Sequence, residues 1–187
     1  MKLKNNTIYI PAGRSVESRW KADDGLTREN IIISALRLFL TRGYKSVSLV
    51  DVAAAAGVTK GGIYHYFASK DELLQTAFSF FLNCIEKRYE ELLRRSASFR
   101  DVLQIILVGE GLENYIKELL GVNIRGNIDY VHFVIEVMRR FPEFSERIRE
   151  SQALLCASIA AKLEQAVAAG EIRKDTDAEA LAVILLT

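Results

Sequence analysis

The chain has 187 residues, half of them hydrophobic, and carries 25 Lys and Arg against 24 Asp and Glu. This length is enough for one or two domains with a real core. No apolar run approaches the roughly 18 residues that a membrane span needs, and the first lysines are not followed by the apolar segment of a signal peptide. The sequence therefore argues against secretion and membrane insertion, and we expect a cytoplasmic protein.

The two cysteines, Cys84 and Cys156, lie far apart and form no C-x-x-C pair. This spacing predicts reduced, structural thiols, with a redox-sensing role as the minor alternative.

Charge is divided unevenly along the chain. The first 70 residues hold 11 Lys and Arg against 5 Asp and Glu, a balance of +6, whereas residues 71–187 have a balance of −5. Such an asymmetry favours an anionic polymer as the partner of the amino-terminal part and a different task for the rest.

Residues 1–26 precede the first expected helix and are predicted to be a flexible extension. Thr7 to Ile10 fits a brief strand that ends at Pro11. The basic residues Arg14, Arg19 and Lys21 would suit an arm in the minor groove of DNA. Acidic residues in the same stretch favour a flexible or packing tail instead.

The first helix is predicted to begin at Thr27 and to end before Gly43. Apolar residues recur there at the steps of one helical face. They are Ile32, Ala35, Leu36 and Phe39.

Two short helices joined by a tight turn are predicted next. Ser48 caps the first of them, and Asp51, three residues later, completes a capping-box-like pair. Gly57 follows where the chain reverses, since glycine adopts positive φ at little cost. Thr59 then caps the second helix. This order of features indicates a helix-turn-helix motif.

The second of these helices has two distinct faces. Ile63 and Phe67, one turn apart, face inward. The outward face carries hydrogen-bond donors and aromatic rings but no carboxylate, which suits a helix that lies in a DNA groove beside phosphates. The predicted DNA-binding residues are Ser48, Thr59, Lys60, Gly61, Gly62, Tyr64, His65 and Lys70.

Several landmarks occur together in the run from Arg28 to Leu74. They are Ala35 and Phe39, Gly43-Tyr44, Val52-Ala53, Ala56-Gly57-Val58-Thr59, Gly61, Ile63-Tyr64, Phe67, Ser69-Lys70 and Leu73. With them the run resembles the DNA-binding domain of TetR/AcrR-type transcriptional regulators. The resemblance implies that the third helix enters the major groove and that Tyr64 and Lys70 hold phosphates. Gly62 departs from the small hydroxyl or alanine that is common there.

The resemblance also implies the architecture of the whole chain. The expected fold is all-α, with an N-terminal three-helix helix-turn-helix domain over residues 27–70. A C-terminal helical ligand-binding and dimerisation domain is expected over residues 71–187. Ser69 and Glu72 form an S-x-x-E signal for a long fourth helix, which runs to about Arg95.

Further helices are predicted beyond the fourth. Phe141-Pro142 ends one of them, and Gly170 follows another. The expected segments are 99–108, 112–120, 128–140, a helix that carries Ile148 to Val167, and a last one from Asp177 onward.

In the TetR/AcrR family the C-terminal half encloses a ligand cavity beside the fourth helix. His132 and Glu136 lie one helical turn apart and would either orient a polar ligand or form a surface pair. A metal pair lacks a third ligand, so no metal or cofactor is expected. The other candidate wall residues are aromatic or aliphatic, and core packing is the alternative for each of them. The candidates are Phe78, Phe81, Leu82, Tyr115, Tyr130, His132, Phe133, Glu136 and Val137.

The last two expected helices resemble the dimer interface of this family. A near-heptad row and an apolar final helix need cover from a second copy. Thr187 ends the chain inside an unfinished helix, which indicates either truncation or a short final helix. The candidate interface residues are Leu155, Ile159, Lys162, Ala166, Val183 and Leu186.

No P-loop, dinucleotide-binding, serine-hydrolase or zinc-protease signature occurs in the sequence, so no enzymatic activity is predicted. The preferred function is a homodimeric repressor that a small-molecule effector releases from a palindromic double-stranded DNA operator. A ligand-independent DNA-binding dimer is the alternative. A helical small-molecule-binding protein or enzyme without a DNA role comes third, because the acid-free face of the third helix opposes it.

Overall fold

The structure of the protein is a computed structural model that describes residues 16–108, 110–121 and 130–186. All regular secondary structure in these ranges is helical, so the predicted all-α fold is confirmed. The elements are α1 (Val16–Arg42), η1 (Tyr44–Ser46), α2 (Leu49–Ala56), α3 (Lys60–Tyr66), α4 (Lys70–Arg95), α5 (Phe99–Leu103), η2 (Gln104–Val108), α6 (Glu110–Leu119), α7 (Tyr130–Arg140), α8 (Phe144–Ala168) and α9 (Ala178–Leu186).

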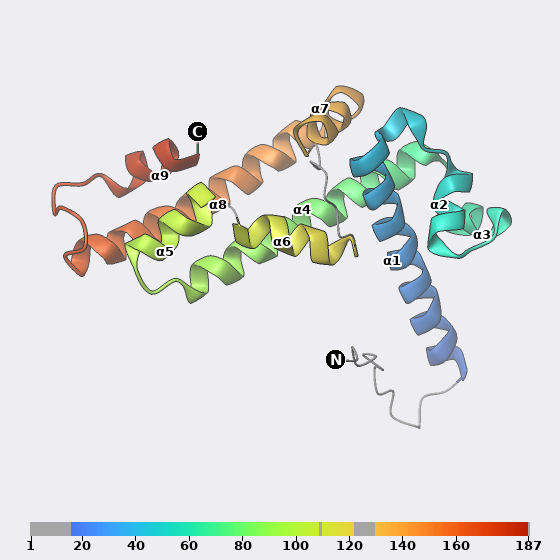
Figure 1. Cartoon of the computed structure of the whole chain (residues 1–187), viewed down its shortest axis with the longest axis horizontal. Coiled ribbons are helices and arrows are strands. Elements are labelled where there is room, and N and C mark those ends of the chain that lie inside the picture. Colours follow the sequence, from blue (N-terminus) through green and yellow to red (C-terminus); the bar gives the residue numbers. More distant parts are fainter. Residues whose placement is uncertain (1–15, 109, 122–129, 187) are drawn as a thin grey trace.

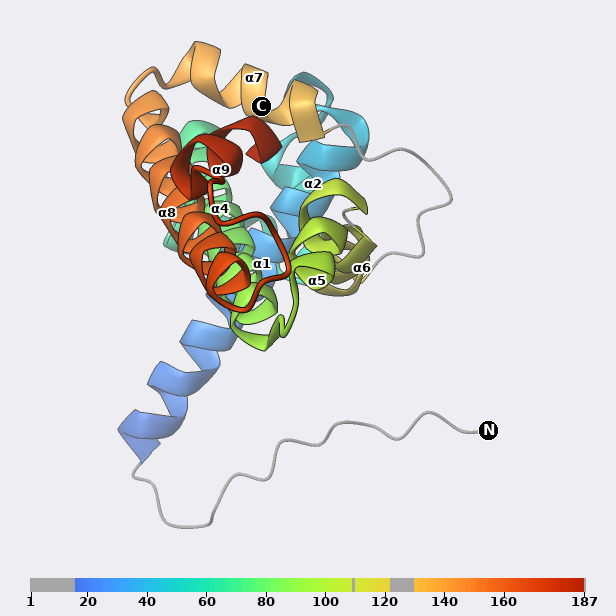
Figure 2. The same cartoon turned by 90° about the vertical axis from the view of Figure 1, so that its left-hand side faces the viewer.

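The long helix α4 connects the two ends of the elongated molecule (Figure 1). Helices α1, α2 and α3 gather around its beginning, whereas α5, α8 and α9 surround its far end. Helix α8 runs beside α4, and α7 lies near the beginning of α4, next to α1. Figure 2, a view along this axis, shows α9 packed on α8. Helices α5 and α6 lie on the opposite side.

The predicted capping box of α2 is present. The Ser48 hydroxyl accepts a hydrogen bond from the Asp51 amide at 3.2 Å, and the Asp51 carboxylate accepts one from the Ser48 amide at 2.7 Å. Gly57 ends the helix at φ 71°, in the left-handed region, as predicted. The short helix therefore has its free backbone groups satisfied at both ends.

Thr59 and Ser69 cap the next two helices, as predicted. Their hydroxyl groups each accept a hydrogen bond, at 3.0 Å, from the amides of Gly62 and Glu72 respectively. The Glu72 carboxylate accepts from the Ala68 amide at 2.8 Å. A full turn of α4 is thus fixed directly after α3.

The prediction that the first helix begins at Thr27 was wrong, because α1 begins at Val16. The helix continues through Gly25, at a cost of about 1 kcal/mol relative to alanine. A contact from another helix stabilises this turn, since the Tyr66 hydroxyl donates to the Asp24 carboxylate at 2.7 Å. The predicted flexible extension is therefore helical over residues 16–26. The predicted strand at residues 7–10, Arg14 and Thr187 lie outside the described residues, as do the side chains of Arg19 and Lys21.

The later helices follow the predicted order with shifted bounds. The segment 99–108 divides into α5 and the π-helical η2, and α6 begins at Glu110 rather than at 112. Helix α7 ends at Arg140, directly before Phe141-Pro142, as predicted. No helix in the described ranges has the length and apolar character of a membrane span.

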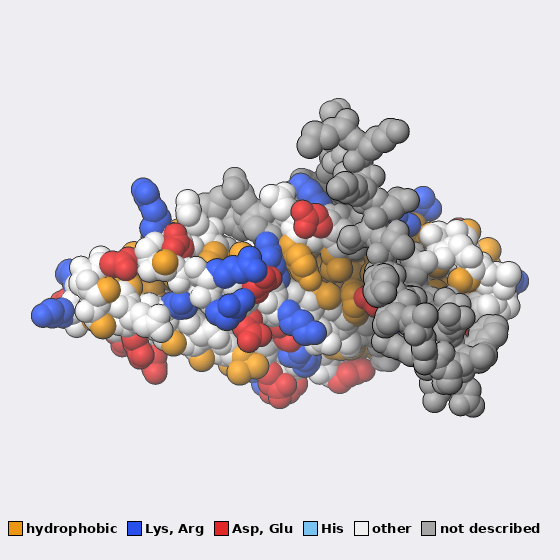
Figure 3. All heavy atoms as spheres, turned by 90° about the horizontal axis from the view of Figure 1, so that it is seen from below, with side chains coloured by type: hydrophobic (Ala, Val, Ile, Leu, Met, Phe, Trp, Pro, Cys, Tyr) orange, Lys and Arg blue, Asp and Glu red, His pale blue; other side chains and the backbone are white. Residues whose placement is uncertain are grey.

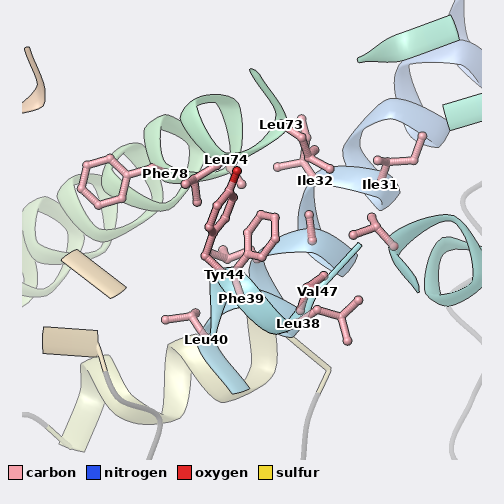
Figure 4. Close-up of a cluster of buried hydrophobic side chains, with 14 of the residues drawn as sticks. Ile31, Ile32, Leu38, Phe39, Leu40, Tyr44, Val47, Leu73, Leu74 and Phe78 are labelled. Atoms are coloured by element: carbon pink, nitrogen blue, oxygen red, sulfur yellow. The ribbon is translucent and has the colours of Figure 1, made fainter. Parts of the chain in front are cut away.

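Buried apolar residues form two separate clusters. The first, which we call the proximal core, joins α1, α2, α3 and the beginning of α4 to α6 and α7 (Figure 4). The second, the distal core, joins the end of α4 to α5, α8 and α9. Fully buried members of the proximal core include Ile31, Leu36, Ile63, Phe67, Leu74, Phe78 and Val137, and the distal core contains Leu93, Val102, Ile159, Leu163 and Ala182.

Candidate nucleic-acid interface

Helix α3 presents the two predicted faces. Ile63 and Phe67 are completely buried against the proximal core, whereas Lys60, Tyr64 and His65 are exposed. Burial of two large side chains fixes the rotation of this short helix. Its polar and aromatic residues are therefore held toward solvent.

A shallow hollow of about 440 Å³ lies between α3 and the segment from η1 to the beginning of α2. Four of the predicted DNA-binding residues line it together, although they come from separate parts of the segment. They are Ser48, Lys60, Tyr64 and Lys70. Lys60, Tyr64 and Lys70 each carry an ammonium or hydroxyl donor that suits an anionic oxygen.

Asp51 also lines this hollow, although the sequence predicts an acid-free surface on α3 itself. Its carboxylate accepts hydrogen bonds from the amide and the hydroxyl of Ser48, at 2.7 and 2.6 Å. These bonds hold the pKa of Asp51 below its usual range. The Asp51 carboxylate thus caps the start of α2, and the Ser48 hydroxyl takes part in the same cap.

The other predicted residues lie at the start and outer side of α3. Thr59, Gly61 and His65 are exposed, and the His65 ring meets the Tyr66 ring edge-on at 5.1 Å. A Cβ at Gly62 would lie 3.1 Å from the Thr59 hydroxyl that caps the helix. Glycine at this position therefore leaves the cap undisturbed. A DNA-binding role for each of these residues stays a prediction.

Lys70 is held in place by an aromatic ring. Its ammonium nitrogen lies 3.9 Å from the centre of the Tyr44 ring, a cation–π contact. Burial, followed by the nearby charge of Arg140, lowers the pKa of Lys70. Lys70 also lines the hollow, where a phosphate contact is predicted.

Sequence reasoning missed Lys45, which lines the same hollow. It lies on η1, a short turn that the apolar spacing does not mark. Its only signal is a position shortly before the capping serine.

Side chains of α1 contact the end of α3 and hold it in place. The Arg28 guanidinium lies over the Phe67 ring, 5.1 Å from its centre, and the Tyr66 hydroxyl bonds to Asp24. Helix α3 is thus held by side chains far away in sequence.

Most candidate ligand-binding residues pack against one another. The rings of Phe78 and Phe81 meet the ring of Phe133 at 5.8 and 6.1 Å, and the Tyr130 ring stacks on Phe81 at 6.3 Å. Phe78, Phe81, Phe133 and Val137 are buried, and Leu82, Tyr115 and Tyr130 are partly buried. These contacts fit the alternative of core packing, and the ligand cavity stays a prediction.

A second hollow, of about 460 Å³, opens between α7 and the end of α1. It brings together three of the candidate ligand-binding residues, His132, Phe133 and Glu136, with Phe39 and Tyr44. His132 is exposed and Glu136 half-buried. The hollow thus lies between the helix-turn-helix segment and the C-terminal helices.

The candidate dimer residues fall into two groups. Ile159 and Ala166 are both buried within their own chain, Ile159 inside the distal core, and so expose little side-chain surface to a second copy. Leu155 packs partly against the distal core, and the Lys162 ammonium donates to the Ser96 carbonyl of its own chain at 3.1 Å. Val183 and Leu186 remain 52% and 37% exposed. A place in the interface stays a prediction for Leu155, Lys162, Val183 and Leu186.

The exposed apolar surface of the last two helices includes two residues that are not among the candidate interface residues. Leu154 on α8 is 68% exposed and Ile184 on α9 is 69% exposed. Charged residues of both signs are interspersed over the C-terminal helices on the face in Figure 3.

Both cysteines are free and half-buried. Burial raises the pKa of the Cys84 thiol, which favours the unreactive protonated form. This agrees with a structural role. Among the described residues, no group of three or more His, Cys, Asp or Glu side chains is placed to hold a metal ion.

The fold and this interface define a helix-turn-helix DNA-binding protein. The sequence model described as "Bacterial regulatory proteins, tetR family" matches residues 31–77, and that of the "Tetracyclin repressor-like, C-terminal domain" matches residues 130–187. The chain belongs to the TetR family of transcriptional regulators. The family consists of regulators rather than enzymes, in agreement with the prediction of no enzymatic activity.

Similar proteins carry related names. The HTH-type transcriptional regulator TtgR of Pseudomonas putida is 32% identical over 169 residues, 89% of this chain and 78% of that protein. The HTH-type transcriptional repressor BepR of Brucella suis biovar 1 is 27% identical over 172 residues, 90% of this chain and 79% of that protein.

Solved structures share the fold. A TetR transcriptional regulator from Chloroflexus aurantiacus J-10-FL aligns with a TM-score of 0.65 at 27% identity, over 88% of this chain and 81% of that chain. A regulator from Saccharomonospora viridis in complex with choline aligns with a TM-score of 0.63 at 21% identity, over 86% and 79%.

The interface predicts different effects for two of its lysines, Lys60 and Lys70. Lys60→Ala on α3 is expected to relax sequence preference and to cost about 1–3 kcal/mol on the preferred site. Lys70→Ala is expected to weaken good and poor sites alike and to reduce the salt slope by about one. Binding-site selection with each variant measures this. An unchanged consensus for Lys60→Ala would contradict a base contact.

Proposed function

We propose that the protein is a homodimeric repressor that binds a near-palindromic operator and is released by a small-molecule effector. The observation that carries this proposal is the hollow beside α3, where Lys60, Tyr64 and Lys70 converge. A surface of this chemistry binds phosphates while the exposed face of α3 reads base edges. The proposal includes a cytoplasmic location, where such a regulator meets its operator.

The dimer is supported by apolar surface on α8 and α9. Leu154, Val183 and Ile184 are each at least half exposed, and in a single copy they would remain in contact with water. A two-fold dimer places the α3 helix of each copy on one half-site. The half-sites then lie about one duplex turn apart, roughly 34–36 Å.

Release by an effector is supported by the path of α4. This helix begins directly after α3 and continues between the C-terminal helices, so a tilt of α4 moves α3. An effector lodged against Phe78, Phe81 and Leu82 would produce such a tilt. By thermodynamic linkage, the operator weakens effector binding by the same factor by which the effector weakens operator binding, typically about 5- to 150-fold. Equal affinities of the effector for free and operator-bound protein would leave the alternative, a ligand-independent DNA-binding dimer.

Selection of sites from a random duplex library, followed by titration at several salt concentrations, tests the DNA-binding proposal. We expect a near-palindromic consensus, two chains per site, and a slope of about −0.9 for each phosphate neutralised in log affinity against log salt. Mass measurement of the complex gives the number of chains. A single chain on an asymmetric site, or an affinity indifferent to salt, would refute the proposal.

A further inference from the structure

Four side chains from three elements meet where the helix-turn-helix segment joins the C-terminal helices. Tyr44 lies on η1, Lys70 and Asp71 open α4, and Arg140 ends α7. Two cations lie against the Tyr44 ring, with the Lys70 ammonium 3.9 Å and the Arg140 guanidinium 4.5 Å from its centre. We call this group the junction cluster.

Asp71 is the acid of the junction cluster, and its carboxylate is held by two donors. The Tyr44 hydroxyl donates to it, and the Arg140 Nε donates to it at 2.8 Å. Figure 4 shows the Tyr44 hydroxyl directed toward α4. The hydrogen bond from Tyr44, followed by that from Arg140, lowers the pKa of Asp71. Burial raises the pKa of Tyr44 to about 12, so the tyrosine remains a donor at neutral pH.

The Asp71 carboxylate forms its ion pair with Arg140, from the side of α7, rather than with Lys70, its neighbour in the chain. The charges of Lys70 and Asp71 are nevertheless close enough to interact. Without Arg140, the nearest cation of the junction cluster able to compensate Asp71 is Lys70. The ammonium of Lys70, a residue that lines the hollow, would then be drawn toward the carboxylate and away from a phosphate bound there.

We propose that Arg140 is a positioning residue for DNA binding: it engages the Asp71 carboxylate from α7, so that the Lys70 ammonium stays available to a DNA phosphate. This inference rests on the proposed DNA contact of Lys70. It makes phosphate binding at the start of α4 depend on the position of α7. A displacement of α7 that withdraws Arg140 would weaken DNA binding without any movement of α3.

Four proteins test the proposal: the wild type, Arg140→Ala, Asp71→Asn and the double variant. Each is titrated with the selected operator duplex over a salt series, and thermal unfolding confirms that each is folded. Arg139→Ala is the matched control, because Arg139 is exposed in the same last turn of α7. Since Arg140 and Asp71 are 39% and 48% exposed, we expect Arg140→Ala to weaken binding only about fivefold.

The double variant distinguishes a positioning role of Arg140 from a direct DNA contact or a purely structural role. In the Arg140→Ala background, Asp71→Asn removes the competing carboxylate and is expected to restore affinity and salt slope to nearly wild-type values. Asp71→Asn alone is expected to change operator affinity by less than about twofold, because an exposed ion pair contributes little free energy. If Arg140 itself contacted DNA, or merely stabilised the fold, Asp71→Asn would not restore binding, and the proposal would fail.

Two further outcomes are distinguishable. Equal affinities of Arg140→Ala and Arg139→Ala, with a wild type that binds its operator, would overturn the role of Arg140 alone. Failure of the wild type to bind any selected duplex would overturn the proposed function first.

Discussion

Phe67→Ala is expected to lower the free energy of unfolding by about 3–5 kcal/mol, the usual cost of deleting a fully buried phenylalanine ring. Phe67 is completely buried, and it follows the last residue of α3 as its C-cap. The loss also removes the ring under the Arg28 guanidinium. Thermal unfolding measures the effect, which corresponds to a fall of roughly 10 °C in Tm for a chain of this size.

Tyr64→Ala is the matched control for Phe67→Ala. Tyr64 lies one turn earlier on the same helix and is 51% exposed, so its removal should leave Tm nearly unchanged while operator binding falls. Phe67→Leu, which keeps most of the buried volume, should remain folded with an intermediate Tm. A Phe67→Ala protein as stable as the wild type would show that α3 is not anchored by this ring.

Leu154→Glu is expected to dissociate the dimer and to lower operator affinity about 100-fold or more, because two linked half-site contacts become separate events. A charge at this exposed position on α8 would be buried without a partner in a dimer built on α8 and α9. The measurements are the mass of the free protein in solution and titration with the selected operator.

Ile135→Glu controls for the addition of a surface charge. Ile135 is also an exposed aliphatic residue, 47% accessible, but it lies on α7. This variant should remain dimeric. A Leu154→Glu protein that keeps the dimer and its affinity would place the contact between copies elsewhere.

The helix-turn-helix segment was predictable because its signals are local. The caps of Ser48 and Thr59 and the reversal at Gly57 each depend on residues within a turn or so of the cap. The inward pair Ile63 and Phe67 follows from helical spacing alone. Local chemistry therefore determined both the bounds of α2 and α3 and the face that α3 presents.

Long-range contacts explain what the sequence did not reveal. Asp23-Asp24-Gly25 looks like the end of a loop, yet α1 runs through it, and Asp24 bonds to Tyr66, which lies 42 positions later. An apolar row on α8 is equally suited to its own chain or to a second copy. The structure assigns Ile159 to the distal core of its own chain, and nothing in the spacing distinguishes these two uses.

The proximal core has a mechanical consequence. It packs α6 and α7 together with α3, whereas the next buried residue of α4 after Phe81 is Leu93, in the distal core. The segment of α4 between these two anchors has no fully buried side chain. Helix α4 is therefore anchored twice, by α1, α2, α3, α6 and α7 near its beginning and by α5, α8 and α9 near its end, so a change in either core acts on α4 at a different point along its length.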